Sequence, residues 1–481
     1  MFTMKKLLLF CIVFVQHMTA QTPCINGFAG QYPCKDYDLL VNVPVATLAN
    51  TNGNPNGSDI WGWTDSTTNK EYAIVAMSNS TAFVDISNPI HPVFLGRLDS
   101  NAGNSVWRDV KVHNNYAFIV ADNAGNHGMQ IFDLTRLRNV SSTQNFTADA
   151  IYTDVGSCHN IFINENSAVA YLVGCRSANG GGPIFLDISN PTNPVALGNY
   201  TQDGYSHDAQ VITYQGPDIN YRGKEIYVGS NENQMVILDV TNKLNVVKLA
   251  DIGYAQIGYT HQGWFTEDHR YFILGDETDE LRFGMNTRTL VFDLSDLNNP
   301  KLSSVYFGNS NAIDHNGYVN GNLFFMASYR AGLRILDLTN IANSTNSMTE
   351  VGYFDTFPDN NATDFNGAWS VYPYFKSGNI VINDIEKGLF VVRKSGTLSA
   401  NNSLIANLFS IAPNPARERV TIQSSGNQNI NNIQLFSILG QKVFEQDNIN
   451  QNSYVLNIKN YRKGVYFIKI NNLKTQKYVV Q

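Results

Sequence analysis

The sequence predicts an all-β protein: a seven-bladed β-propeller closed by an N-terminal strand and followed by a small C-terminal β-sandwich. The first observation is a strand that ends in aspartate, then serine or threonine, then a turn, which recurs along the chain. The recurring aspartates are Asp85, Asp133, Asp187, Asp239, Asp293 and Asp337. They lie 44 to 54 residues apart, a period typical of blades of four short strands. Each carboxylate can accept N–H groups of the following turn, so we expect a structural role.

The second observation is a seventh repeat that departs from this pattern. Residues 388–393 end in Arg393 instead of aspartate, and no fourth strand follows them. Residues 40–46 have the length of a strand and precede the first repeat. We predict that they complete the seventh blade, because a closed ring leaves no open strand edge. The predicted propeller domain covers residues 21–396.

Composition narrows the class of protein. Of the 481 residues, 43% are hydrophobic and only 15% are charged, which is typical of a well-packed globular chain. The net charge is −7, and no run of lysine or arginine occurs. We therefore expect neither nucleic acid nor an anionic membrane as a partner.

The N-terminus predicts export. Lys5 and Lys6 precede a short apolar run that ends near Val15, and small residues lead to Ala20, so residues 1–20 are predicted to be a secretory signal peptide. A membrane anchor would need about twenty apolar residues, and this run is shorter. A lipoprotein site at Cys11 is disfavoured by bulky Phe10. We expect an exported, soluble chain without a membrane span.

Four cysteines remain after the predicted signal peptide, an even number in an oxidising compartment. Cys158 and Cys175 bracket a predicted hairpin and are expected to pair across it. Cys24 and Cys34 would then close a small N-terminal loop. Metal or catalytic thiol roles are disfavoured, because no CxxC spacing occurs.

The strands that end in aspartate resemble the LVIVD repeat. Together with residues 24–34 and the strands that begin at His159, His207, His261 and His315, they resemble the "choice-of-anchor B" family of secreted bacterial proteins. The resemblance covers the signal peptide to the seventh blade. It implies architecture and location, and it implies no particular activity.

The composition changes after Gly396, where an Asn/Ser-rich linker is predicted at 397–407 and a small β-sandwich at 408–481. The motifs at 413–415, 438–440, 463–467 and 477–481 resemble the C-terminal sorting domain of the type IX secretion system of Bacteroidetes. That resemblance implies recognition by the secretion machinery, removal of the domain, and a propeller that is extracellular or attached to the outer cell surface. A generic carbohydrate-binding or Ig-like sandwich is the alternative, disfavoured because the segment lacks clustered tryptophans.

Four of the nine histidines recur at one position of the repeat: His159, His207, His261 and His315. Each opens a short apolar run that we predict to be the first strand of a blade. The other three blades are expected to place Asp59, Arg108–Asp109 and Asn366 in this position. First strands line the central channel of a propeller, so the histidines should form an arc around one mouth of the channel.

The loops predicted on the same face are long and polar, and function often lies in such loops. The candidate binding residues at the channel mouth are His159, His207, Asp208, His261, His315, Asp109, Asp276 and Glu277. Trp61, Trp107, Trp264 and Trp369 lie on neighbouring first strands. The favoured function is a binding module for a polysaccharide, peptide or surface protein.

Two interpretations of the histidines stay open. In the first, His207, His261 and His315, joined by Asp208, Asp276 or Glu277, hold a divalent metal ion of the zinc type, and a metal-bound water makes a hydrolase conceivable. In the second, each histidine forms a hydrogen bond within or between blades, and the protein is architectural or binds a ligand without metal. No local metal motif such as HExxH occurs, and no nucleophile elbow or P-loop is present.

Overall fold

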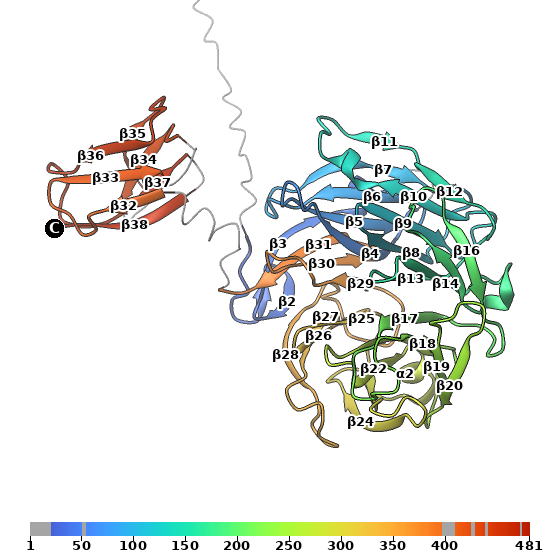
Figure 1. Ribbon diagram of the computed structural model, residues 1–481. Coiled ribbons are helices and arrows are strands. Elements are labelled where there is room, and N and C mark those ends of the chain that lie inside the picture. The colour runs from blue at the N-terminus through green and yellow to red at the C-terminus, as the bar shows by residue number, and fades with distance from the viewer. Residues whose placement is uncertain (1–20, 51–53, 397–408, 425–428, 438–440, 472–473) are drawn as a thin grey trace, which may run out of the picture. The chain divides into compact units, whose positions relative to one another are not determined.

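The computed structural model describes residues 21–50, 54–396, 409–424, 429–437, 441–471 and 474–481 (Figure 1). The predicted signal peptide and the predicted linker at 397–407 lie outside these residues. Apart from Lys376–Gly378, the chain divides into two compact units between Ser395 and Gly396. Strands dominate both units, so the predicted all-β class is confirmed. No helix in the described ranges is long and apolar enough to cross a membrane.

The first unit contains seven sheets in its described residues, and each has an antiparallel body of four strands. In six of them these four strands come from one continuous stretch of the chain. The first three, from the inner strand outwards, are β4 (Gly57–Thr64), β5 (Glu71–Met77), β6 (Ser80–Asp85), β7 (Val93–Asp99); β8 (Arg108–His113), β9 (Tyr116–Ala121), β10 (Met129–Asp133), β12 (Ala150–Tyr152); and β13 (Asn160–Asn164), β14 (Val169–Val173), β15 (Ile184–Asp187), β16 (Val195–Asn199). β11 (Gln144–Phe146) adds to β7 in parallel.

The next three sheets follow the same order. They are β17 (Asp208–Thr213), β18 (Glu225–Ser230), β19 (Met235–Asp239), β20 (Val247–Ile252); β21 (Thr260–Phe265), β22 (Tyr271–Asp276), β23 (Arg288–Asp293), β24 (Lys301–Phe307); and β25 (Gly317–Asn320), β26 (Leu323–Ser328), β27 (Gly332–Asp337), β28 (Thr349–Phe354). β2 (Tyr32–Lys35) and β1 (Phe28–Ala29) extend the last of these. The described helices are short: α1 (Val45–Leu48), η1 (Leu134–Leu137), η2 (Asn179–Gly181) and α2 (Asp279–Phe283).

The seventh sheet joins the two ends of the propeller. It contains β29 (Ala368–Tyr372), β30 (Asn379–Asp384), β31 (Gly388–Lys394) and the N-terminal β3 (Tyr37–Val43). The inner strands contact one another in the order β4, β8, β13, β17, β21, β25, β29 and back to β4, which closes the ring. The predicted closure by an N-terminal strand is therefore confirmed. The strand lies three residues earlier than predicted, because Pro44 cannot donate to the ladder and α1 begins after it.

The recurring aspartates have the structural role that the repeat predicts. In all six repeats, the aspartate Oδ1 accepts the backbone N–H two residues later, at 2.8–3.1 Å. Arg393 replaces aspartate in the seventh repeat, where β31 runs on to Lys394. Its guanidinium instead donates to the Asn379 carboxamide oxygen.

Both predicted disulfides, Cys24–Cys34 and Cys158–Cys175, are present. The second joins the two ends of the β13–β14 hairpin. Apolar side chains pack between adjacent sheets, as where the Phe83 and Phe132 rings stack with centroids 4.5 Å apart.

The second unit has its own sheets and core in the described residues. One sheet contains β32 (Phe409–Ala412), β33 (Arg419–Ser424) and β36 (Ser453–Asn457), and the other β35 (Lys442–Gln446), β34 (Ile433–Ser437), β37 (Gly464–Ile470) and β38 (Lys474–Val480). Both contribute to one core that includes Val420, Ile422, Ile433 and Ile468.

The closing strand gives the first testable prediction. Leu40 of β3 is 3% exposed and packs in one cluster with Leu389 and Val391 of β31. Leu40→Ala is expected to cost about 2–5 kcal/mol of unfolding free energy, because it leaves a cavity where the ring closes. Leu302→Ala, at a side chain that is 42% exposed on an outer strand, is the control and should cost about 0.5 kcal/mol or less. Urea denaturation measures both, and equal losses would contradict the role of β3.

Candidate functional site

The four recurring histidines form a row on adjacent inner strands. The ring centroids of His159 and His207 are 4.1 Å apart, those of His207 and His261 4.3 Å, and those of His261 and His315 4.4 Å. The Trp369 ring lies 4.8 Å beyond His315 and continues the row. The arc predicted around the channel mouth is therefore present in the structure, with four histidines in consecutive blades.

Trp369, and not Asn366, occupies the corresponding position in the seventh blade, so that assignment was wrong. Gly367 adopts a φ of 89°, and β29 begins only after it, at Ala368. The Asn366 carboxamide oxygen instead accepts from the Arg330 guanidinium outside the row.

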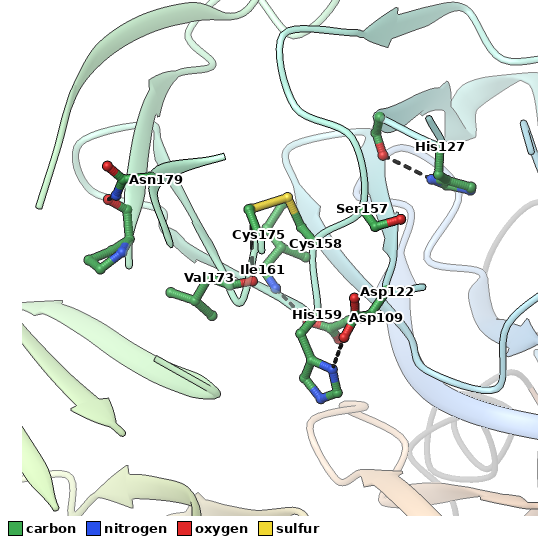
Figure 2. Close-up of a disulfide and its surroundings, with 12 residues drawn as sticks. Asp109, Asp122, His127, Ser157, Cys158, His159, Ile161, Val173, Cys175 and Asn179 are labelled. Atoms are coloured by element: carbon green, nitrogen blue, oxygen red, sulfur yellow. Dashed lines mark hydrogen bonds and ion pairs between the residues drawn. A yellow bond between two sulfur atoms is a disulfide. The ribbon is translucent and has the colours of Figure 1, made fainter. Parts of the chain in front are cut away.

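Three of the four histidines use their Nδ1 atom in a hydrogen bond to another part of the protein. His207 Nδ1 donates to the carbonyl oxygen of His261 at 3.1 Å, and His315 Nδ1 donates to that of Trp369 at 2.5 Å. His159 Nδ1 instead pairs with Asp122 Oδ2 at 3.1 Å, as Figure 2 shows. His261 Nδ1 has no hydrogen-bond partner in the described part of the chain. A donor bond from Nδ1 fixes the tautomer and leaves a lone pair on Nε2.

Burial keeps these imidazoles neutral. His207, His261 and His315 are 6% exposed or less. Desolvation, with smaller contributions from neighbouring histidines, lowers the pKa of His261 and of His315 to about 3 and that of His207 well below its ordinary value. At neutral pH they are therefore uncharged and able to donate a lone pair.

Glu277 is the carboxylate that the fold brings to the row. Its Oε2 lies 3.7 Å from His261 Nε2, and its Oε1 lies 3.7 Å from His315 Nε2. Tyr329 donates its hydroxyl to Oε1 at 2.9 Å, which orients the carboxylate. Among the described residues, these three side chains form the one group of at least three histidine, cysteine or acidic residues whose ligand atoms all lie within 4.8 Å of one another. His207, which the sequence suggested as a ligand, is outside this group.

The other predicted carboxylates lie elsewhere. Asp276 accepts the N–H groups of Gly258 and Tyr259 and the Tyr254 hydroxyl, so it holds a loop in place. Asp109 and Asp208 each lie one residue further along their inner strand than the position that the histidines occupy. Neighbouring residues of a strand alternate in direction, so Asp208 points to the adjacent blade and accepts from Asn160 at 2.9 Å.

A buried charge cluster fills the channel below the histidines. Lys111 Nζ donates to Asp109 and, at 3.2 Å, to Asp59. The Lys111 charge and hydrogen bonds, acting against desolvation, lower the pKa of Asp59, while burial raises that of Asp109 well above its ordinary value and that of Asp208 to about 6. Asp59 Oδ2 also accepts the backbone N–H of Val110, and Asp109 Oδ2 accepts that of Ile161. These carboxylates therefore join neighbouring blades.

A cavity of ≈ 370 Å³ opens above the row. It is lined by Trp107, Asp122, Asn123, His159, Arg176, Tyr205, His207, Tyr259 and Glu277. The space enclosed by the four histidines below it is only ≈ 20 Å³, about the room for one water molecule. A ligand larger than water would therefore rest on the row and not pass through it.

The aromatic wall of this cavity was missed by the sequence analysis. Tyr205 and Tyr259 each lie two residues before a histidine of the row, so the pattern Tyr-x-His was available as a signal. The Arg176 guanidinium lies 3.8 Å above the Tyr205 ring, and the Tyr259 hydroxyl donates to Glu232 at 3.1 Å. These contacts hold the wall in place.

The four tryptophans do not share this mouth. Trp107 and Trp369 border the histidines. Trp61 and Trp264 line a separate cavity of ≈ 420 Å³ together with Phe162, Tyr372 and other residues. They lie two or three residues further along their strands than the histidine position, which moves them down the channel and away from the row.

The Cys158–Cys175 disulfide stands directly beside the row. Figure 2 shows Cys158 immediately before His159, whose ring points to Asp122. The bond ties the start of β13 to the end of β14 and so restricts the backbone that carries His159.

Fold and site together define the class: a β-propeller whose channel mouth carries a histidine row. The LVIVD repeat model matches residues 69–100, 105–133, 178–202 and 217–247, and the model of the secretion system C-terminal sorting domain matches residues 410–481. The chain thus contains LVIVD repeats and a sorting domain, which confirms both resemblances. The sorting domain indicates export by the type IX secretion system to the cell surface or the extracellular space. Membership of the choice-of-anchor B family stays a prediction.

Three solved structures are similar to this chain at low sequence identity. A functionally unknown protein from Desulfotomaculum acetoxidans DSM 771 is 12% identical, with a TM-score of 0.43 over 61% of this chain and 88% of that one. The C-terminal WD40 domain of Sif2 is 10% identical, with a TM-score of 0.47 over 75% and 99%. A putative 6-phosphogluconolactonase from Bacteroides uniformis ATCC 8492 is 11% identical, with a TM-score of 0.44 over 61% and 87%. No curated protein sequence matches the chain.

The structural role of the row is testable at His207. His207→Ala leaves the His261 carbonyl oxygen buried without its donor and is expected to cost about 1–3 kcal/mol of unfolding free energy. His91→Ala, at an exposed histidine outside the row, is the control and should change stability by about 0.5 kcal/mol or less. If urea denaturation gave the same result for both variants, the hydrogen bond would not contribute to stability.

Proposed function

We propose that this exported propeller binds a polysaccharide or peptide segment in the cavity above the histidine row, through a divalent metal ion held by His261, His315 and Glu277. The observation that carries the proposal is the position of Glu277. Its oxygens face two neutral Nε2 atoms at 3.7 Å, which is too long for a hydrogen bond.

A cation accounts for this arrangement. His315 donates from Nδ1, so its Nε2 turns a lone pair towards the carboxylate. Two electron-rich atoms repel each other unless a positive charge lies between them. Zinc bonds of about 2.0–2.2 Å place tetrahedral ligand atoms about 3.3–3.6 Å apart, close to the separations in this group. Two imidazoles and a carboxylate are also a common ligand set for zinc.

The cavity supports the ligand class. Three protein ligands leave one position of a four-coordinate ion open, and one of them, Glu277, also lines the 370 Å³ cavity. Trp107, Tyr205 and Tyr259 offer aromatic faces, and Arg176 and Asn123 offer hydrogen-bond donors. Hydroxyl or carboxylate oxygens of a sugar or peptide could then bind the metal while their carbon skeleton packs on the rings.

Zinc binding is the first test of the proposed function. The chain from residue 21 to 481, stripped with chelator and titrated with zinc, is expected to take up about one equivalent. Glu277→Gln removes one ligand charge while it can still accept from Tyr329, and should weaken zinc binding roughly tenfold or more.

The matched control is His159→Asn, a change in the same row but outside the ligand group, which should keep zinc affinity within about twofold of wild type. Wild-type protein that takes up no zinc, manganese, iron or copper would overturn the metal part of the proposal. The histidines would then serve to join the blades alone.

The open coordination position also favours a second candidate function, a metal-dependent hydrolase. A zinc-bound water has its pKa lowered to about 7 and could attack a bound ester or amide. The zinc-loaded protein is then expected to hydrolyse a chromogenic ester such as 4-nitrophenyl acetate faster than Glu277→Gln does. The chelated protein should lose this rate and regain it with zinc. Equal rates for wild type and variant would remove this candidate.

A further inference from the structure

A group of four buried carboxyl side chains lies in α2 and next to it. Asp279 and Glu280 belong to α2 in the β22–β23 connection, Asp276 ends β22, and Asp314 precedes β25. All four are 2% exposed or less. A buried carboxylate is costly unless hydrogen bonds or a cation compensate it.

Arg288 compensates part of this charge. Its Nε donates to Asp279 Oδ2 at 2.6 Å, and its terminal nitrogen lies 3.6 Å from Asp276 Oδ2. Asp276 also accepts several hydrogen bonds from its loop. One guanidinium and these bonds therefore account for Asp276 and for one oxygen of Asp279.

Four carboxyl oxygens remain without a partner in the described residues. They are Asp279 Oδ1, Glu280 Oε1, Glu280 Oε2 and Asp314 Oδ1, and all four are buried. Asp279 and Glu280 are adjacent in α2, and the Asp314 carboxyl lies against Gly275, the residue before Asp276. The unpartnered oxygens thus belong to one group.

We propose that Asp279, Glu280 and Asp314 bind a calcium ion below α2. The unpartnered atoms are all oxygens, which a hard cation prefers, and no sulfur or imidazole ligand is needed. Two positive charges would offset the carboxylates that Arg288 leaves uncompensated. The sorting domain directs the protein outside the cell, and calcium sites of extracellular modules bind at about 10⁻⁴–10⁻³ M.

The site differs from the histidine group in its spacing. Its ligand oxygens do not all lie within 4.8 Å of one another, whereas opposite ligands of a bound calcium lie about 4.6–5.2 Å apart. Calcium binding is therefore expected to draw α2 and Asp314 together.

Calcium binding would also bear on the channel mouth. Glu277 lies between Asp276 and α2, so an ion that fixes α2 restricts the backbone next to Glu277. This consequence depends on the proposed metal site, whereas calcium binding itself does not.

The experiment is a calorimetric titration of calcium into chelator-treated chain 21–481, with a thermal melt at each concentration. We expect saturable binding at about 10⁻⁴–10⁻³ M and a melting temperature that rises with calcium. Glu280→Gln keeps the size of the side chain and should weaken calcium binding roughly tenfold or more while zinc binding at the histidine group is retained. Glu277→Gln should do the reverse, so the two proposals can fail separately.

A wild-type protein that shows neither heat nor a change in melting temperature at about 10 mM calcium would overturn the proposal, and it needs no variant to fold. Glu280→Gln with unchanged calcium affinity would also overturn it, since binding would then lie elsewhere. Asp364→Asn, at an exposed acidic residue paired with Arg330, is the matched control and should bind calcium as wild type does.

Discussion

The inner strand of every blade has one edge with no strand beside it, and this constraint shapes the channel. The N–H and C=O groups on that edge are buried by the adjacent blade and need partners. Side chains of the neighbouring blade supply them. Asp59 and Asp109 accept from the N–H groups of Val110 and Ile161. Gln262 Oε1 accepts that of Gly317 in the same way at 2.9 Å. Seven sheets that share few strand-to-strand bonds are thus joined around the ring by polar side chains.

This constraint explains why aspartate, glutamine and histidine recur at buried positions of the inner strands. An apolar side chain in the same position would leave a backbone group unpaired, at a cost of about 1–3 kcal/mol. The carboxylates bring charge with them, and Lys111 is present where Asp59 and Asp109 meet. Among the described residues, Arg288 is the one cation that forms ion pairs with the acidic residues around α2, so part of their charge stays uncompensated.

Much of the fold could be predicted from the sequence, because it depends on local patterns. These are the repeat period, the aspartate turn, and the seventh repeat that ends in Arg393 instead of aspartate. The Cys158–Cys175 disulfide followed from a predicted hairpin, and Cys24–Cys34 followed as the remaining pair. The site was harder, since its residues come from different blades and their directions depend on the pleat. Their common position in the repeat identified the four histidines of the row. Asp208 was expected beside them, but it directly follows His207 in its strand, so its side chain points to the adjacent blade. Trp61 and Trp264 lie on first strands as predicted, but they line a separate cavity, because the sequence does not show how deep along a strand a side chain lies.

Structural and metal-binding roles for the histidines were weighed as alternatives, and the geometry makes them compatible. An imidazole has two nitrogens, and the bond from Nδ1 to the neighbouring carbonyl occupies only one of them. The same bond holds the ring still and directs the Nε2 lone pair into the channel mouth. A histidine that joins blades is therefore also a preorganised ligand, at no additional cost to the fold. Of the four histidines, His261 and His315 are the two that face Glu277, whose carboxylate oxygens lie 3.7 Å from their Nε2 atoms. In the proposed metal site, the position of the ion is therefore set by the loop that carries Glu277 and not by the histidine row itself.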